Sequence, residues 1–186
     1  MSLLAATAGY LLGLRDPIVA DFMRAWPDEP EQRNLQPTML PVQGFLGDLR
    51  ATTGLAADLV EAAPNLAWRQ TYGAAEMPPC FLDRYGWTEL LGTRGHWRSD
   101  ELAAGFLLLG PDTLYPEHRH AAEEIYIVLV GTADWSRGGE GWRRRMPGEV
   151  VHHDSQTPHA MRTGAEPLLA LYLWRGGDLA EKSRLT

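Results

Sequence analysis

The half of the chain after residue 90 is divided into short apolar runs, and this pattern limits the possible folds more than any other feature. The runs are rich in branched and aromatic side chains and are separated by Gly-, Pro- and Asp-containing breaks. Such spacing is typical of strands in an antiparallel sandwich or barrel. Gly138-Gly139 predicts a hairpin between two of the strands. We expect strands over residues 102–109, 125–130, 132–136, 142–146, 149–153, 160–163 and 168–174.

The first 90 residues follow a different pattern, in which apolar side chains recur every three or four positions. This spacing predicts helices. One is expected to begin with Asp16 as its N-cap and Pro17 at its first position. The range 27–37 is polar and holds three prolines, so we expect a loop there. Residues 42–63 are helix-like again, with a break at Thr53-Gly54.

The chain is therefore expected to be mainly β with N-terminal helices. In this interpretation residues 1–90 form a helical segment that packs on a β-barrel formed by residues 91–186. A length of 186 residues suits one domain with a core of its own.

Charge and cysteine content exclude several classes of protein. With 24 acidic and 17 basic side chains the formal net charge is −7, which argues against a nucleic-acid-binding surface. The one basic cluster, residues 143–145, is expected to be a solvated strand edge. Cys80 is the only cysteine, so an internal disulfide is excluded and a reducing compartment, the cytoplasm, is expected. No apolar run reaches the about 18 residues that a membrane span needs.

All six histidines lie at or after residue 96, and two of them begin a compact motif. His118 and His120 are separated by one residue, and Glu124 follows four residues later. Side chains two apart on a strand share a face, so both imidazoles can reach one ion. Glu124 would return to that ion from the next strand, after a turn. Two imidazoles and a carboxylate suit a divalent transition metal better than calcium.

A fourth ligand is expected from a later strand. His159 follows Pro158 and lies eleven residues after Gly148, so a turn and a strand would bring it back over the first hairpin. His152 and His153 compete for this role. Because they are neighbours within a strand, one faces inward and the other outward, and we favour His159. The ligand set leaves the ion open among iron, manganese, zinc and nickel.

These segments resemble the paired motifs of the cupin superfamily. The first matches His-x-His-x3-Glu-x6-Gly without a gap, and the second matches Pro-Gly-Asp…Pro-x-His more loosely, because Glu149 replaces Asp. The resemblance implies a double-stranded β-helix, a jelly-roll barrel, that holds a metal in its mouth. Residues 115–126, Trp135, residues 158–161 and the segment that ends in Trp174 narrow the resemblance to the cupin-type dimethylsulfoniopropionate lyases.

That family implies β-elimination of a small zwitterionic sulfonium carboxylate to dimethyl sulfide and acrylate. The family's proposed base is a tyrosine that matches Tyr126, whose two-residue offset from Glu124 places it at the metal; Tyr115 is the second choice. A phenol has a pKa of about 10, and lowering it by about 3 units needs about 4 kcal/mol, which a nearby metal can supply. Aromatic faces bind soft cations. Trp174, Tyr172 and Trp135 lie on strands expected to line the barrel and could hold the sulfonium.

Other functions remain open at this point. One is another metal-dependent cupin enzyme, either an iron dioxygenase or a lyase or isomerase of a different small carboxylate. Another is a non-catalytic barrel that binds a small molecule. A DNA-binding sensor would carry basic helices, whereas the N-terminal helices here hold more acidic than basic residues. The protein is expected to act without nucleic acid or membrane, as a monomer or a homodimer.

Overall fold

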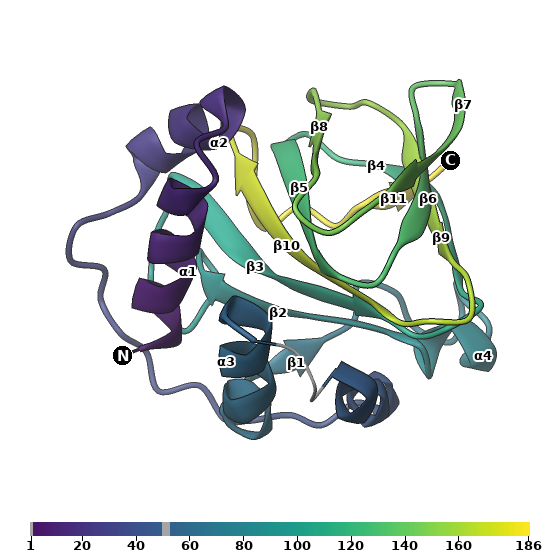
Figure 1. Ribbon diagram of the computed structural model, residues 1–186, viewed down its shortest axis with the longest axis horizontal. Helices are drawn as coiled ribbons and strands as arrows, with labels where there is room; N and C mark the ends of the chain where they lie inside the picture. Colours follow the sequence, from purple (N-terminus) through teal and green to yellow (C-terminus); the bar gives the residue numbers. More distant parts are fainter. Residues whose placement is uncertain (1, 50–52) are drawn as a thin grey trace.

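The computed structural model describes residues 2–49 and 53–186, and within them the strands form two antiparallel sheets that make a barrel (Figure 1). The six-stranded sheet has the order β1-β2-β3-β10-β5-β8, formed by Trp68–Arg69, Tyr85–Leu91, Leu102–Leu109, Leu168–Arg175, Glu123–Val130 and Val150–His153. The five-stranded sheet has the order β11-β4-β9-β6-β7, formed by Arg184–Leu185, Leu114–Arg119, His159–Thr163, Ala133–Arg137 and Glu140–Arg145.

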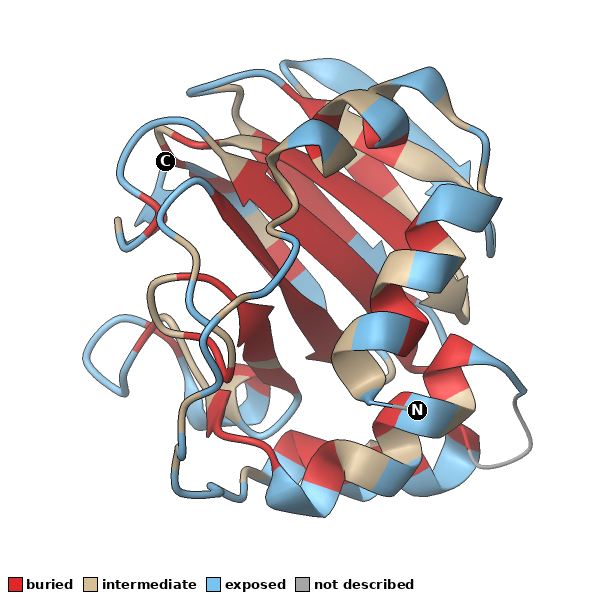
Figure 2. Ribbon diagram, turned by 90° about the vertical axis from the view of Figure 1, so that its left-hand side faces the viewer, coloured by how far each residue is buried: buried red, intermediate tan, exposed pale blue. Residues whose placement is uncertain are grey.

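Helices cover the outer face of the six-stranded sheet (Figures 1 and 2). α2 begins as predicted, because Oδ1 of Asp16 accepts hydrogen bonds from the backbone N–H groups of Ile18 and Val19 at 2.9 and 3.2 Å. The α-helices are α1 (Leu3–Gly13), α2 (Pro17–Phe22), α3 (Leu55–Ala62) and α4 (Pro79–Leu82). The 3-10 helices are η1 (Met23–Ala25), η2 (Pro41–Leu49) and η3 (Ala63–Asn65).

The six-stranded sheet separates two apolar cores, and β10 shows how its sequence serves both. Leu169, Leu171 and Leu173 pack with the helices, whereas Tyr172 and Trp174 belong to the core inside the barrel. β3 is buried along its whole length, which explains its continuous apolar sequence. The aromatic side chains of β10 therefore point toward the interior, where the predicted site lies.

The fold confirms the prediction of a mainly β chain with N-terminal helices. The seven expected strands are present within one to two residues at each end. β1 lies before residue 90 and β2 runs from Tyr85 to Leu91, so the six-stranded sheet takes strands from both predicted parts of the chain. In the range 42–63, η2 replaces the first expected helix, α3 begins after Gly54, and residues 50–52 lie outside the described part.

Two surface predictions are also resolved by the structure. Gly138 and Gly139 have φ values of +55° and +80° and connect β6 to β7, as the hairpin prediction requires. β7 forms the edge of the five-stranded sheet, and its arginines, residues 143–145, lie along that largely exposed strand. None of the described helices has the length and apolar character needed to cross a membrane.

Candidate active site

The register of the strands places the candidate residues in two rows inside the barrel. In the six-stranded sheet Glu124 on β5 lies between Trp174 on β10 and His153 on β8. In the five-stranded sheet His118 on β4 lies opposite His159 on β9. These residues come together because antiparallel pairing brings the starts of β5 and β9 to the same end of the barrel as the last residues of β4, β8 and β10. His120, just beyond the end of β4, completes the group.

Three of these side chains converge on one point. The Nε2 atoms of His120 and His159 each lie 3.2 Å from Oε2 of Glu124. The ligand atoms of the three residues all lie within 4.8 Å of one another, and all three side chains are buried. Of the three histidines considered for the later strand, His159 is the one that joins His120 and Glu124. We call these three residues the His-Glu triad.

The hydrogen bonds of the rings show that the triad fits a cation. Nδ1 of His120 lies 2.9 Å from the carbonyl oxygen of Ala122, and Nδ1 of His159 lies 2.9 Å from that of Thr157. A carbonyl oxygen only accepts hydrogen bonds, so each Nδ1 carries the proton and the Nε2 of a neutral ring presents a lone pair. When both rings are neutral, three electron-pair donors face one another, which is the arrangement that a divalent metal requires.

Glu124 is held as an anion by its neighbours. Oε1 accepts a hydrogen bond of 2.5 Å from Nε1 of Trp174, whose ring also stacks on His120 with centroids 4.0 Å apart. Burial alone would raise the pKa of Glu124, but in the metal-free protein the positive charge that a proton gives His120 and the hydrogen bonds from the surrounding histidines hold that pKa well below its usual value. The carboxylate is therefore fixed in position and ready to bind a cation.

His118 lies beside the triad and not within it. Its Nδ1 is bonded to the carbonyl oxygen of Pro116 at 2.9 Å, and its ring contacts His159 with centroids 4.2 Å apart. The other face of His118 stacks on Tyr115, with centroids 4.0 Å apart and planes inclined by 8°. Burial and the nearby His159 keep the pKa of His118 well below its usual value, so its ring is neutral. The structure thus brings three of the four predicted ligands together and places the fourth at their side.

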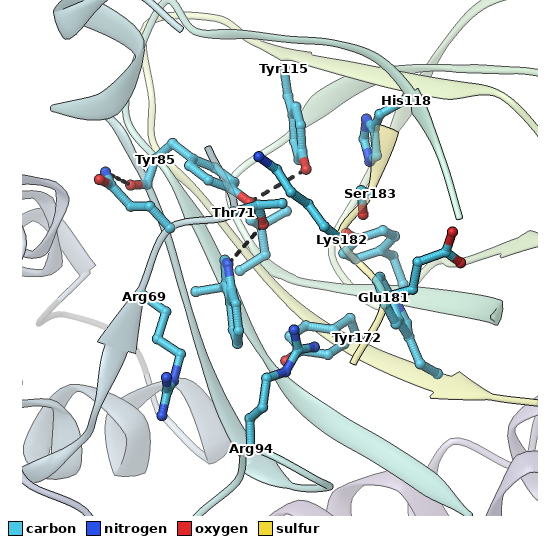
Figure 3. A pocket seen from close by; sticks show the side chains of 15 residues that line it. Arg69, Thr71, Tyr85, Arg94, Tyr115, His118, Tyr172, Glu181, Lys182 and Ser183 are labelled. Atoms are coloured by element: carbon cyan, nitrogen blue, oxygen red, sulfur yellow. Dashed lines mark hydrogen bonds between the residues drawn. The ribbon is translucent and has the colours of Figure 1, made fainter. Parts of the chain in front are cut away.

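A cavity of about 350 Å³ lies beside the triad, and its wall includes His118 and Trp174, which contact triad residues (Figure 3). Five residues named from the sequence line it: Tyr115, His118, Tyr126, Tyr172 and Trp174. The other lining residues are Arg69, Gln70, Thr71, Tyr85, Trp87, Arg94, Leu107, Glu181, Lys182 and Ser183. The cavity wall is therefore largely aromatic, and it also carries the charged side chains of Arg69, Arg94, Lys182 and Glu181.

The sequence analysis expected Trp135 to line the cavity, but the structure places it outside the cavity wall. It is 2% exposed and packs against Tyr126, with ring centroids 5.4 Å apart. Its Nε1 is buried and has no hydrogen-bond partner among the described residues. β6 belongs to the five-stranded sheet, and there its inward side chain contributes to the packed core.

The two candidate bases are both buried phenols. Burial and the charge of Glu124 raise the pKa of Tyr126 well above its ordinary value. Burial and neighbouring tyrosines do the same for Tyr115, whose hydroxyl lies 3.4 Å from those of both Tyr72 and Tyr85. Neither phenol ionises in this surrounding unless a cation compensates.

Several cavity residues carry no signal in the sequence. Glu181, Lys182 and Ser183 come from the tail after β10, which folds back over the cavity and is held where Oε2 of Glu181 accepts from the backbone N–H of Ala121 at 2.8 Å. Arg94 is fixed by the buried Glu89, whose Oε1 accepts from the Arg94 backbone N–H at 2.6 Å. The first contact joins residues 60 positions apart, and the second depends on the burial of a carboxylate that the sequence alone does not reveal.

Comparison with known proteins identifies the family of the chain and agrees with the fold. The family model for dimethylsulfoniopropionate lyase matches residues 17–170. The dimethylsulfoniopropionate lyase DddQ of Ruegeria pomeroyi is 39% identical over 181 residues, which cover 94% of this chain and 89% of that relative. A crystal structure of DddQ from Ruegeria pomeroyi DSS-3 has a TM-score of 0.88 at 34% identity and covers 99% of this chain and 95% of that one.

A more distant likeness concerns the fold alone. A cupin-2 domain from Rhodospirillum rubrum has a TM-score of 0.52 at 18% identity, over 66% of this chain and 76% of that one. The barrel is therefore a cupin barrel, as the two sequence motifs predicted. The chain belongs to the dimethylsulfoniopropionate lyase family, a family of carbon–sulfur lyases.

Proposed function

We propose that this chain cleaves dimethylsulfoniopropionate into dimethyl sulfide and acrylate by a metal-assisted β-elimination. The observation that carries the proposal is the His-Glu triad, whose three ligand atoms converge on one point beside an aromatic cavity. Family membership supports the substrate, and the cavity supports it independently, because a small zwitterion needs an electrophile for its carboxylate and apolar faces for its sulfonium.

His120, Glu124 and His159 would hold the ion, and His118 stands beside them as the fourth candidate ligand. A bound divalent ion would act there as a Lewis acid on the substrate carboxylate, which makes the adjacent carbon more acidic. One anionic ligand leaves a 2+ site with a formal charge of +1, which favours an anionic head group. Iron, manganese, zinc and nickel all suit imidazole and carboxylate donors.

Tyr126 is the proposed base. Its Oη takes the proton from the carbon next to the carboxylate, the electrons of that C–H bond form the double bond, and the C–S bond breaks with its electron pair on sulfur. One zwitterion thus gives one neutral sulfide, one acrylate anion and one proton, which Tyr126 must return to solvent. Because burial and Glu124 raise the pKa of Tyr126, the cation must supply more than the about 4 kcal/mol that an exposed phenol would need.

Aromatic side chains are proposed to hold the sulfonium. Tyr172 and Trp174 line the cavity next to Tyr126, and a soft cation gains about 0.5–2 kcal/mol over each such face. Trp135 is proposed to support the ring of Tyr126 from behind. Tyr115, between His118 and the tyrosines of the cavity wall, is the second candidate for proton transfer.

The chemistry would then belong to residues 91–186, as the sequence analysis expected. Residues 1–90 are proposed to support the outer face of the sheet and to complete the wall of the cavity. Their contribution to that wall comes from Arg69, Gln70, Thr71, Tyr85 and Trp87.

The test is release of dimethyl sulfide into the headspace by purified protein, first stripped of metal and then supplied with Fe²⁺, Mn²⁺, Zn²⁺ or Ni²⁺ singly. We expect equimolar sulfide and acrylate without oxygen uptake; oxygen consumption would favour a dioxygenase instead. Tyr126→Phe is expected to lower kcat by about 10²- to 10⁴-fold, the usual loss for a general base, with metal content unchanged. If Tyr126→Phe keeps its turnover and Tyr115→Phe loses it, the base is Tyr115.

A further inference from the structure

A fourth buried histidine, His153, contacts the triad without belonging to it. Its Nδ1 lies 3.3 Å from Oε2 of Glu124, the same oxygen that faces His120 and His159. The contact follows from the register of the sheet, in which Glu124 and His153 are direct partners on β5 and β8. Like Glu124, His153 is almost completely buried.

His153 also touches a second member of the triad. Its ring stacks on that of His159, with centroids 3.9 Å apart and planes inclined by 10°. The preceding residue, His152, faces the other way, and its Nε2 lies 2.8 Å from Oε1 of Glu123 at the partly exposed side of the sheet. Of these two adjacent histidines, His153 contacts the triad and His152 contacts Glu123 instead.

The partners of the ring define its protonated nitrogen. A carboxylate oxygen only accepts, so the contact with Glu124 requires the proton on Nδ1. Nε2 is then a bare acceptor, and it is buried with no hydrogen-bond partner within the described residues. Burial and the nearby His159 lower the pKa of His153 to about 4, which agrees with a neutral ring. His153 thus donates one N–H to Glu124 and adds no charge that would repel a cation.

Trp174 makes the matching pair of contacts on the other side. Its Nε1–H donates to Oε1 of Glu124, and its ring stacks on His120. Each carboxylate oxygen therefore receives an N–H group from a ring that also packs on one histidine of the triad. Partners of this kind orient metal ligands, and their loss weakens metal binding.

We propose that His153 is a positioning residue for the metal site: its Nδ1–H fixes Oε2 of Glu124, and its ring face fixes His159, so that both present their donor atoms to one ion. The proposal rests on the proposed function, because it assigns to His153 a part in forming the metal site that this function requires. It concerns the affinity of the metal-free protein for a divalent ion, and this affinity is measurable without turnover.

The experiment compares three substitutions at one position. In His153→Asn the amide nitrogen takes the place of Nδ1 and keeps the donor; in His153→Gln the amide moves to the place of Nε2; His153→Leu keeps bulk without a donor. The Kd for Mn²⁺ is measured by competition with a chelating dye, starting from metal-free protein. We expect His153→Leu and His153→Gln to raise the Kd about 10- to 100-fold, and His153→Asn to restore most of the affinity. The matched control His152→Asn is expected to bind like the wild type.

Binding by His153→Leu within about twofold of wild type, or binding by His153→Asn as weak as that of His153→Leu, would overturn the proposal, since outer partners of metal ligands normally change affinity by more. Thermal unfolding of each metal-free variant shows whether it is folded. If His153→Leu is not folded, the proposal is tested by the Kd of His153→Asn against that of His153→Gln, and equal values would overturn it. A wild type that binds no divalent ion would overturn the proposed metal site itself, whereas a wild type that binds and variants that bind equally well would overturn only the role of His153.

Discussion

The hydrogen bond between Trp174 and Glu124 gives a stability prediction that needs neither metal nor substrate. Trp174→Phe removes the Nε1–H that Oε1 of Glu124 accepts at 2.5 Å, inside a buried pair, while a phenyl ring retains much of the stack on His120. A hydrogen bond to a charged group contributes about 1.5–3 kcal/mol, so Trp174→Phe is expected to lower the free energy of unfolding by about 2 kcal/mol. In the Glu124→Gln background, where the acceptor is a neutral amide, Trp174→Phe is expected to lower the free energy of unfolding by about 1 kcal/mol.

The assay is urea unfolding of metal-free protein at pH 7 for the wild type, both single variants and the double variant. The two substitutions are expected to couple by about 1–2 kcal/mol. Trp87→Phe is the matched control, because Trp87 also lines the cavity but donates its Nε1–H to the hydroxyl of Thr71 at 3.1 Å. Trp87→Phe should lower the free energy of unfolding by the same amount whether position 124 is Glu or Gln. If Trp174→Phe and Glu124→Gln add within about 0.5 kcal/mol, the buried charged hydrogen bond does not exist.

Three further predictions concern other parts of the molecule. Gly105→Ala would place a Cβ well inside van der Waals contact of the backbone carbonyl oxygen of Thr88 and 2.7 Å from Oη of Tyr172. We expect a loss of about 1–3 kcal/mol of stability in urea unfolding together with a raised KM; unchanged values of both would contradict the packing. His159→Ala is expected to lose bound metal in elemental analysis of the purified protein, and full occupancy would exclude it as a ligand. His96 accepts a hydrogen bond at Nε2 from the backbone N–H of Ala67 at 3.0 Å, and burial lowers its pKa below the usual value of about 6.5. The unfolded chain therefore binds this proton first, so the stabilisation is complete above about pH 6.5 and is lost as the pH falls through the lower folded pKa. His96→Gln keeps an acceptor that does not titrate, and it should flatten this part of the stability profile; an unchanged profile would assign the slope to other groups.

The strands that the sequence predicted best are those whose burial is decided by their own residues. β3 and β10 are apolar runs that are buried whatever lies next to them. The sequence analysis did not predict strand β2, because the burial of its polar residues depends on partners outside the strand. The hydroxyl of Thr88 donates to the carbonyl oxygen of Ala67, and the carboxylate of Glu89 is bound by Arg94. When these contacts are not known, the polar residues Thr88 and Glu89 indicate an exposed segment and not a buried strand.

The same difference applies to the site. Spacing along two strands and one turn was enough to select His120, Glu124 and His159, which the structure brings together. It was not enough to place His118, because β4 ends at Arg119 and the two histidines of the motif no longer extend from one regular strand. The cavity wall from the C-terminal tail, including Lys182, was unpredictable for another reason: that tail is held by contacts with distant segments, among them the ion pair with Glu76 and the hydrogen bond between Glu181 and Ala121.

The His-Glu triad takes its members from both halves of the barrel, Glu124 from the six-stranded sheet and His159 from the five-stranded sheet. A shared ion would therefore act as a non-covalent crosslink between the sheets at that end. Its contribution to stability would grow with the concentration of free metal as RT ln(1 + [M]/Kd). The lifetime of this enzyme in a cell would then depend on metal supply as well as on sequence, so that scarcity would lower the amount of protein along with its activity.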